Sequence, residues 1–180
     1  EVGGSVFRIG LDSENHINPF EIPIIPKDET PSEVLKSHIV NLTGLVKVML
    51  GGVSPEEEAI LDQTITATYA SRDITPEQDF QGKTPPLLED IEAVLRNVDG
   101  GKNMAERLYR FTKGSYAGFT NKPTNVSVKS NLIVFSIRDL EEELRPIAMY
   151  IILNFIWSLV RAELKKRMMV IDEAWLMMRN

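Results

Sequence analysis

The chain has 180 residues, of which 43% are hydrophobic and 26% charged, which suits one domain with a buried core, or one domain with an insertion. Its net charge of −6 argues against a broad phosphate-neutralising surface, although it is compatible with a local basic patch. The absence of cysteine excludes disulfides, cysteine catalysis and thiolate metal sites. His16 and His38 lie far apart with no metal-ligand spacing around them, so we expect both to be structural.

The first 28 residues are predicted to be extended. The stretch SVFRIG (5–10) is typical of a short strand. The stretch INPFEIPIIP (17–26) contains three prolines, which are excluded from a helix interior because proline lacks the amide hydrogen. We therefore expect one strand followed by an irregular connection.

Residues 30–114 are predicted to form about four successive helices. TPSE (30–33) and SPEE (54–57) are both capping boxes with proline at the first helical position. The stretch TPPLLEDIEAVLRNVDGG (84–101) begins with threonine and proline and stops at two glycines, and Asn103 is expected to cap a further helix together with the glutamate three residues later. The segment thus reads as an all-helical unit.

The hydrophobic period changes after the glycine-rich loop that follows these helices. Val126 and Val128 alternate with polar residues, which predicts a half-exposed strand. The run NLIVFSI (131–137) is continuously apolar and rich in β-branched residues, which is the pattern of a strand buried on both faces.

A long helix and a second strand are predicted next. Asp139 and Glu142 are expected to begin the helix, which reaches about Lys166. Its apolar stretch, 147–160, has 14 residues and is too short to span a membrane, which takes roughly 20, so we interpret it as a buried helix. The run MMVI (168–171) predicts a second buried strand. Strand, helix and strand together predict a βαβ crossover with its two strands parallel in one sheet.

Two adjacent acids, Asp172 and Glu173, follow that predicted strand. Ligands of open α/β sheets bind outside the carboxyl ends of parallel strands. Side chains alternate along a strand, so the two acids point differently and can have different tasks. In phosphoryl transfer one acid can hold magnesium through water while the other activates the attacking water. The alternative is an ordinary turn signal at the end of a strand, and the residues alone leave both readings open.

Four stretches, in this order and spacing, resemble the TraC-like ATPases of conjugation and type IV secretion (the fourth VirB component), which belong to the FtsK–HerA group of P-loop motors. The stretches are INPFEI, NLIVFSIRDL, LRPIAMYIILNFIW and MMVIDEAWLMM. The resemblance covers nearly the whole chain. Asp172 and Glu173 match the Walker B pair of that family.

The resemblance implies an α/β fold that is a fragment of a RecA-like P-loop NTPase core with a large all-helical insertion. Residues 1–28 and 126–180 would form the partial core, and residues 29–125 the insertion. Asp172 would hold magnesium through water, and Glu173 would be catalytic. The Walker A loop, GxxxxGK[ST], is absent from the sequence, so the nucleotide-binding residues are unknown and we expect the fragment alone to be inactive.

The resemblance also implies the setting of the full-length protein. It would be an ATPase that uses ATP and magnesium to power the transfer of DNA or protein, while the fragment alone is not expected to hold either tightly. We expect a homo-hexamer that is cytoplasmic and peripheral at the inner face of the bacterial inner membrane. Its expected partners are other secretion-system components there, with DNA as a further candidate.

Two alternatives and one choice of residue stay open. The chain could be part of a HerA-like DNA-translocating ATPase, or a non-catalytic helical interaction module with a small sheet. Nucleotide binding by the full-length protein separates the module from both motors, and DNA-stimulated turnover separates the motors from each other. Arg107, Arg138 and Arg145 are all available to contact a neighbour's phosphate, and the sequence does not choose among them.

Overall fold

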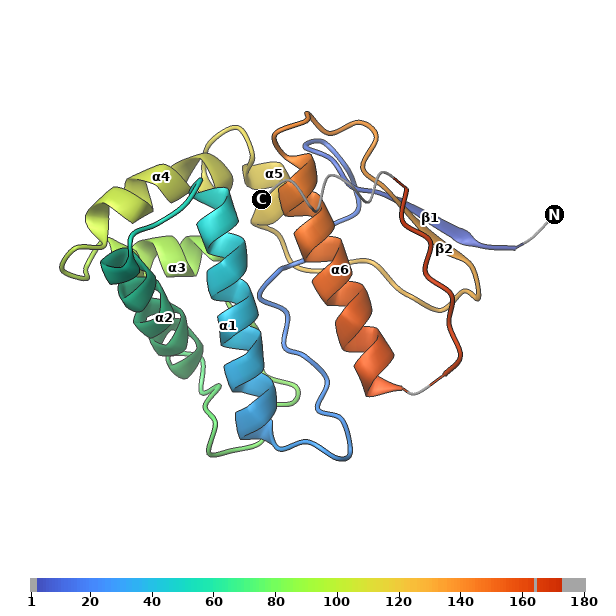
Figure 1. The fold of residues 1–180 in the computed structure, drawn as a ribbon, viewed down its shortest axis with the longest axis horizontal. Coiled ribbons are helices and arrows are strands. Elements are labelled where there is room, and N and C mark those ends of the chain that lie inside the picture. Colours follow the sequence, from blue (N-terminus) through green and yellow to red (C-terminus); the bar gives the residue numbers. More distant parts are fainter. Residues whose placement is uncertain (1–2, 164, 173–180) are drawn as a thin grey trace.

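The computed structural model describes residues 3–163 and 165–172. In this part of the chain six helices accompany a two-stranded parallel sheet, which confirms the predicted α/β class (Figure 1). The elements in chain order are β1 (Ser5–Arg8), α1 (Pro31–Met49), α2 (Pro55–Ala70), α3 (Leu88–Leu95), α4 (Lys102–Thr112), α5 (Ala117–Thr120), β2 (Ile133–Ser136) and α6 (Arg145–Ala162).

The predicted capping boxes begin the first two helices. Before α1, the Thr30 side chain accepts a hydrogen bond from the backbone of Glu33 (3.3 Å), and the Glu33 carboxylate accepts one from the Thr30 backbone (2.9 Å). Ser54 and Glu57 make the same reciprocal pair before α2. These bonds satisfy amides that a helix start leaves without intrahelical partners, so local sequence fixes both starts.

The next two helices exist as predicted, but they begin elsewhere. The helix expected from Thr84 begins at Leu88, because the following prolines hold the residues before them in extended conformations. The Asp90 carboxylate accepts a hydrogen bond from the Leu87 amide (2.8 Å) and so caps this start. The helix expected to be capped by Asn103, and so to begin at residue 104, begins two residues earlier, at Lys102, and no side chain caps it.

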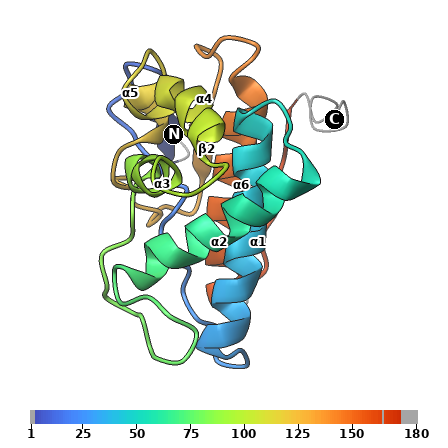
Figure 2. The ribbon, with the colours of Figure 1, turned by 90° about the vertical axis from the view of Figure 1, so that its left-hand side faces the viewer.

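Helices α1 to α4, which we call the helical unit, enclose the larger part of the core. Helix α2 packs on α1 and α3, and α3 packs on α4 (Figure 2). Large side chains that are buried there almost completely include Leu35, Leu45, Leu61, Ile65, Tyr69, Ile91, Leu95 and Phe111. Burying each such apolar side chain is worth roughly 1.5–3 kcal/mol, so this unit carries most of the hydrophobic stabilisation.

A buried carboxylate joins α3 to α4. Glu92 is almost fully buried and accepts hydrogen bonds from the Arg96 Nε (2.8 Å) and from the Thr112 hydroxyl. Burial alone would raise the pKa of Glu92, but the bonds from Thr112 and Arg96, together with the charges of Arg96 and Lys113, outweigh it and lower that pKa. Glu92 is therefore held as a paired anion, as buried charges require.

Helix α6 lies between the helical unit and the sheet (Figure 1). It packs against α1 on one side, and its Phe155 contacts the ring of Phe135 on β2 on the other (6.2 Å between ring centroids). The predicted burial is confirmed for Ile147 and Ile151, whereas Trp157 is 57% exposed because no described element covers that side of the helix. Within residues 3–163 and 165–172, every helix is too short or too polar to span a membrane.

Helix α6 begins later and ends earlier than predicted. Asp139 and Glu142 lie in turns before the helix instead of beginning it, and the helix ends at Ala162 instead of about Lys166. Pro146 has no amide hydrogen to donate back to residue 142, so the helix cannot extend through it toward Asp139.

The sheet pairs β1 with β2 in parallel, with Ser5 opposite Ile133 and Arg8 opposite Ser136. One face carries Phe7 and Phe135, whose rings are 5.5 Å apart, and this face is the one that α6 covers. On the other face Val6 is 63% and Val134 44% exposed. The prediction that 131–137 is a strand buried on both faces is therefore wrong in this structure, although the strand itself is confirmed.

The predicted strand at 168–171 is not present in the described residues. Residues 165–171 have no strand hydrogen bonding, and Met168 and Val170 are 91% and 84% exposed. The parallel partner of β2 is β1 instead, so the predicted βαβ pairing across α6 is wrong here. A strand buried on both faces needs a layer on each side, and the described residues supply a layer to only one face of the sheet.

The strand predicted at Val126 and Val128 is also absent. This segment is irregular, and part of it pairs with the loop after β1. The Asn125 amide donates to the His16 carbonyl (3.1 Å), and the Asn125 side chain accepts from the His16 amide (2.7 Å). Asn125, just before Val126, is therefore fixed by the loop after β1 and not by a strand partner.

Candidate functional site

The two acids predicted for the site are only partly described. Asp172 is exposed in a turn at the end of the extended segment 165–171, and Glu173 lies outside the described residues. This segment runs back in the opposite direction to α6 and ends at the end of the molecule where α6 begins (Figure 1; Figure 2). The structure therefore places one of the two acids, on an exposed turn instead of a buried strand end.

The carboxyl ends of the two parallel strands lie side by side, because Arg8 is the register partner of Ser136. The loop after β1 folds back onto that strand, with Ser13 and Asn15 (3.2 Å) both donating to the Arg8 carbonyl. These bonds satisfy a carbonyl at an open strand end.

The loop after β2, residues 137–144, is anchored on the core. Leu140 and Leu144 are almost fully buried. Their amides close two turns by donating to the carbonyls of Ile137 (3.1 Å) and Glu141 (3.0 Å). The backbone that connects the strand end to α6 is therefore fixed by packing as well as by hydrogen bonds.

Glu143, in the same loop, is contacted by two side chains, one from α4 and one from the connection after α4. Arg110 of α4 forms an ion pair with the Glu143 carboxylate (3.2 Å), and the Tyr116 hydroxyl donates to the same carboxylate oxygen. The guanidinium of Arg110 lies over the Tyr116 ring, 4.5 Å from its centroid, which adds a cation–π contact. The hydrogen bond to Glu143 raises the pKa of Tyr116, against the opposing effect of Arg110.

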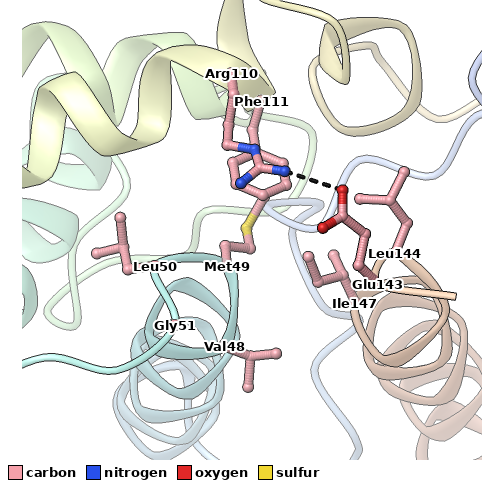
Figure 3. A pocket seen from close by; sticks show the side chains of 9 residues that line it. All are labelled: Val48, Met49, Leu50, Gly51, Arg110, Phe111, Glu143, Leu144 and Ile147. Carbon is pink, nitrogen blue, oxygen red and sulfur yellow. Dashed lines mark hydrogen bonds and ion pairs between the residues drawn. The ribbon is translucent and has the colours of Figure 1, made fainter. Parts of the chain in front are cut away.

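A surface pocket of about 220 Å³ lies beneath this ion pair, where α1, α4 and the start of α6 meet (Figure 3). Its walls come from Val48, Met49, Leu50, Gly51, Arg110, Phe111, Glu143, Leu144 and Ile147. Most of these residues are apolar, but the surface they expose to the pocket is mostly polar, and its two charged side chains form the ion pair with each other. The pocket brings together no nucleophile with a base, so its lining does not support chemistry.

Two of the three candidate arginines are engaged with the protein itself. Arg107 donates to the carbonyls of Leu50 and Gly52 (2.6 Å to the latter) and so closes the end of α1. Arg145 donates through Nε to the Leu140 carbonyl (3.2 Å). Arg138 is exposed, and no hydrogen bond or ion pair joins it to another residue in the described part of the chain.

The histidines have structural contacts. The His38 Nε2 lies 2.9 Å from the Tyr69 hydroxyl, and the His16 backbone pairs with Asn125. Among the described residues, no three His, Cys, Asp or Glu side chains converge on a possible metal position. Neither histidine is near Asp172 in the chain, and none of these contacts was visible as a sequence pattern.

The fold also occurs in a solved structure, that of VirB4 of Thermoanaerobacter pseudethanolicus. The match has a TM-score of 0.84 at 22% sequence identity and covers 97% of this chain and 69% of the other. The chain has the VirB4 fold. The resemblance predicted from INPFEI and the later stretches is thus confirmed at the level of the fold. No protein-family model and no curated protein sequence matches the chain.

Proposed function

We propose that this chain is part of an ATPase that powers macromolecule transfer through a bacterial type IV secretion or conjugation system. The observation that carries the proposal is the VirB4 fold, which extends over 97% of the chain. The order and spacing of the four sequence stretches support the same assignment, because they resemble this family independently of the fold. The chain bears the Walker B stretch and has no Walker A motif of its own.

The proposed organisation is a partial RecA-like core, residues 1–28 and 126–180, with a helical insertion at 29–125. The positions of the elements support it. Helices α1 to α5 all fall within the proposed insertion, while both strands and α6 fall outside it. The parallel pairing of β1 with β2, which are separated by the whole insertion, is compatible with one sheet interrupted by it.

In the proposed site Asp172 holds magnesium through water and Glu173 orients or deprotonates the attacking water. ATP would supply the transferable phosphoryl group, and the magnesium held there would neutralise the charge that develops on it. Asp172 fits this assignment in one respect, since its carboxylate is exposed. A carboxylate is the kind of ligand that magnesium prefers.

The proposed setting is that of the family which the sequence resembles. The full-length protein would act as a homo-hexamer in the cytoplasm, at the inner face of the inner membrane. It would bind other components of the secretion system, and DNA is a candidate partner. Turnover stimulated by DNA would instead favour a HerA-like translocating motor.

The first test replaces each acid in the full-length protein. Glu173→Gln keeps the shape of the side chain and removes its basicity, so we expect magnesium–ATP binding to survive and single-turnover hydrolysis to fall by roughly 10²–10⁴. Asp172→Asn is expected to weaken magnesium-dependent binding as well as turnover.

Thermal melting of both variants is the control. A purely structural acid pair predicts lower melting temperatures and no selective loss of the chemical step. Near-normal turnover in Glu173→Gln together with a lowered melting point would overturn the catalytic assignment, and failure of the unchanged protein to bind nucleotide would favour the non-catalytic helical module.

A further inference from the structure

The loop 137–144 is a fixed platform at the carboxyl end of β2. In open α/β sheets this is the end at which ligands bind. Two buried leucines, Leu140 and Leu144, anchor the loop, and Glu143 is held from the helical unit by Arg110. A side chain near the start of this loop therefore projects from a positioned backbone.

Arg138 is the second residue after β2, at the start of this platform. A guanidinium has five N–H donors in a planar fork that matches the oxygens of a phosphate. Arg107 and Arg145 donate hydrogen bonds to backbone carbonyls. Arg138 makes no hydrogen bond or ion pair with any residue that the structure describes. The structure thus distinguishes Arg138 from the other two arginines as a candidate to bind phosphate, which the sequence alone could not do.

The acidic residues after the two strands also indicate which kind of ligand Arg138 could bind. Asp139 is adjacent to Arg138, and Asp12 follows the neighbouring strand β1; both are exposed. The Asp139 carboxylate, which is next to Arg138 in the chain, repels a bare anion, because like charges close together are unfavourable. A phosphate group that arrives together with a divalent cation avoids this repulsion, since the cation compensates the carboxylates while Arg138 contacts phosphate oxygens.

We infer that Arg138 binds a phosphate group of the magnesium–nucleotide complex. The inference rests on the proposed ATPase function and adds a phosphate-binding residue to it. Arg138 acts from the loop after β2, independently of Asp172 and Glu173. Its conservative replacement, lysine, keeps the charge and loses the planar fork, so the two contributions can be measured separately.

The test uses the full-length protein with three variants. Arg138→Ala is expected to weaken magnesium–ATP binding by about 10- to 100-fold in titration calorimetry, as the loss of a charge-assisted hydrogen-bonded pair predicts, and Arg138→Lys by less. Neither change should move the melting temperature, because Arg138 is exposed and holds no other described residue. Arg72→Ala is the matched control, since Arg72 is a partly exposed arginine paired with Asp90 in the helical unit.

The outcomes separate this inference from the proposed function. If the unchanged protein hydrolyses ATP and Glu173→Gln does not, the proposed function stands. In that case, an Arg138→Ala variant that binds and hydrolyses ATP like Arg72→Ala overturns the inference alone. A lowered melting temperature in Arg138→Ala, with unchanged affinity, would show a structural role and overturn it as well.

Discussion

At the scale of single residues, the contact between His38 and Tyr69 links α1 and α2 to the segment before α1. The Tyr69 hydroxyl donates to the Phe20 carbonyl (2.8 Å), so it accepts a hydrogen bond from His38 Nε2 (2.9 Å). The Tyr69 phenol stays neutral, because burial, with the charge of Glu21, raises its pKa. Burial lowers the pKa of His38 to about 4, so the folded protein holds this ring neutral at pH values where an exposed histidine is charged.

This shift predicts a pH dependence of stability. Between pH 6.5 and about 4 the unfolded chain binds a proton at His38 that the folded chain does not, so the free energy of unfolding falls as the pH is lowered through this window. The loss should total roughly 1–3 kcal/mol. Urea unfolding of His38→Gln should show a flatter profile over the same window. An equally steep profile in that variant would contradict the assignment to His38.

At the scale of elements, the packing of α6 on α1 depends on a glycine within α1. A β-carbon added at Gly44 would lie 2.6 Å from the hydroxyl oxygen of Tyr150, a residue of α6. That hydroxyl donates to the Asn41 carbonyl (2.9 Å). The close approach of the two helices therefore uses the space that the missing side chain leaves.

The prediction is a coupling between these two positions. Alanine stabilises a helix interior by about 1 kcal/mol relative to glycine. In the Tyr150→Phe background, which lacks the hydroxyl, Gly44→Ala should show that gain in urea unfolding. In the unchanged protein the clash should offset it by roughly 1 kcal/mol, because Tyr150 must move and give up its bond to Asn41. An equal effect of Gly44→Ala in both backgrounds would contradict the proposed clash with the Tyr150 hydroxyl.

At the scale of the whole molecule, the 180-residue chain combines a helical unit that holds most of the hydrophobic core with a small sheet that is covered on one face only. The helical unit buries most of the large apolar side chains, whereas Val6 and Val134 leave one face of the sheet open. The hydrophobic stabilisation of the chain therefore comes mainly from the helical unit and not from the sheet.

The chain by itself should bind ATP no more tightly than about millimolar. Most phosphate contacts in P-loop proteins come from the backbone amides and lysine of a GxxxxGK[ST] loop, and this sequence contains none. Titration calorimetry on the isolated chain, with and without magnesium, measures this directly. Magnesium-dependent binding at micromolar concentration would mean that the nucleotide site lies elsewhere than at the strand ends.

The existence of α1 to α4 and of α6, and the starts of α1 and α2, could be predicted from the sequence. The boxes Thr30–Glu33 and Ser54–Glu57 were predictable because each closes hydrogen bonds across three residues, within one turn. The strand at 133–136 was predictable from its β-branched run, and the VirB4-like organisation from the order of four stretches. Two of the errors at helix boundaries arose next to prolines, because Pro85 and Pro86 hold the residues before them extended and Pro146 has no amide hydrogen to donate.

Two features depend on the tertiary structure and could not be predicted: which segments pair, and which side chains have no partner within the described protein and can bind a ligand. The partner of β2 is β1, from the other end of the chain, and residues 168–171 are extended and exposed although their apolar run is typical of a buried strand. The separation of Arg138 from the two engaged arginines depends on carbonyls that only the fold brings within reach. The hydrophobic pattern of a segment determines how much free energy the segment gains when it is buried. It does not determine which other segment covers it, because that depends on contacts between residues far apart in the sequence.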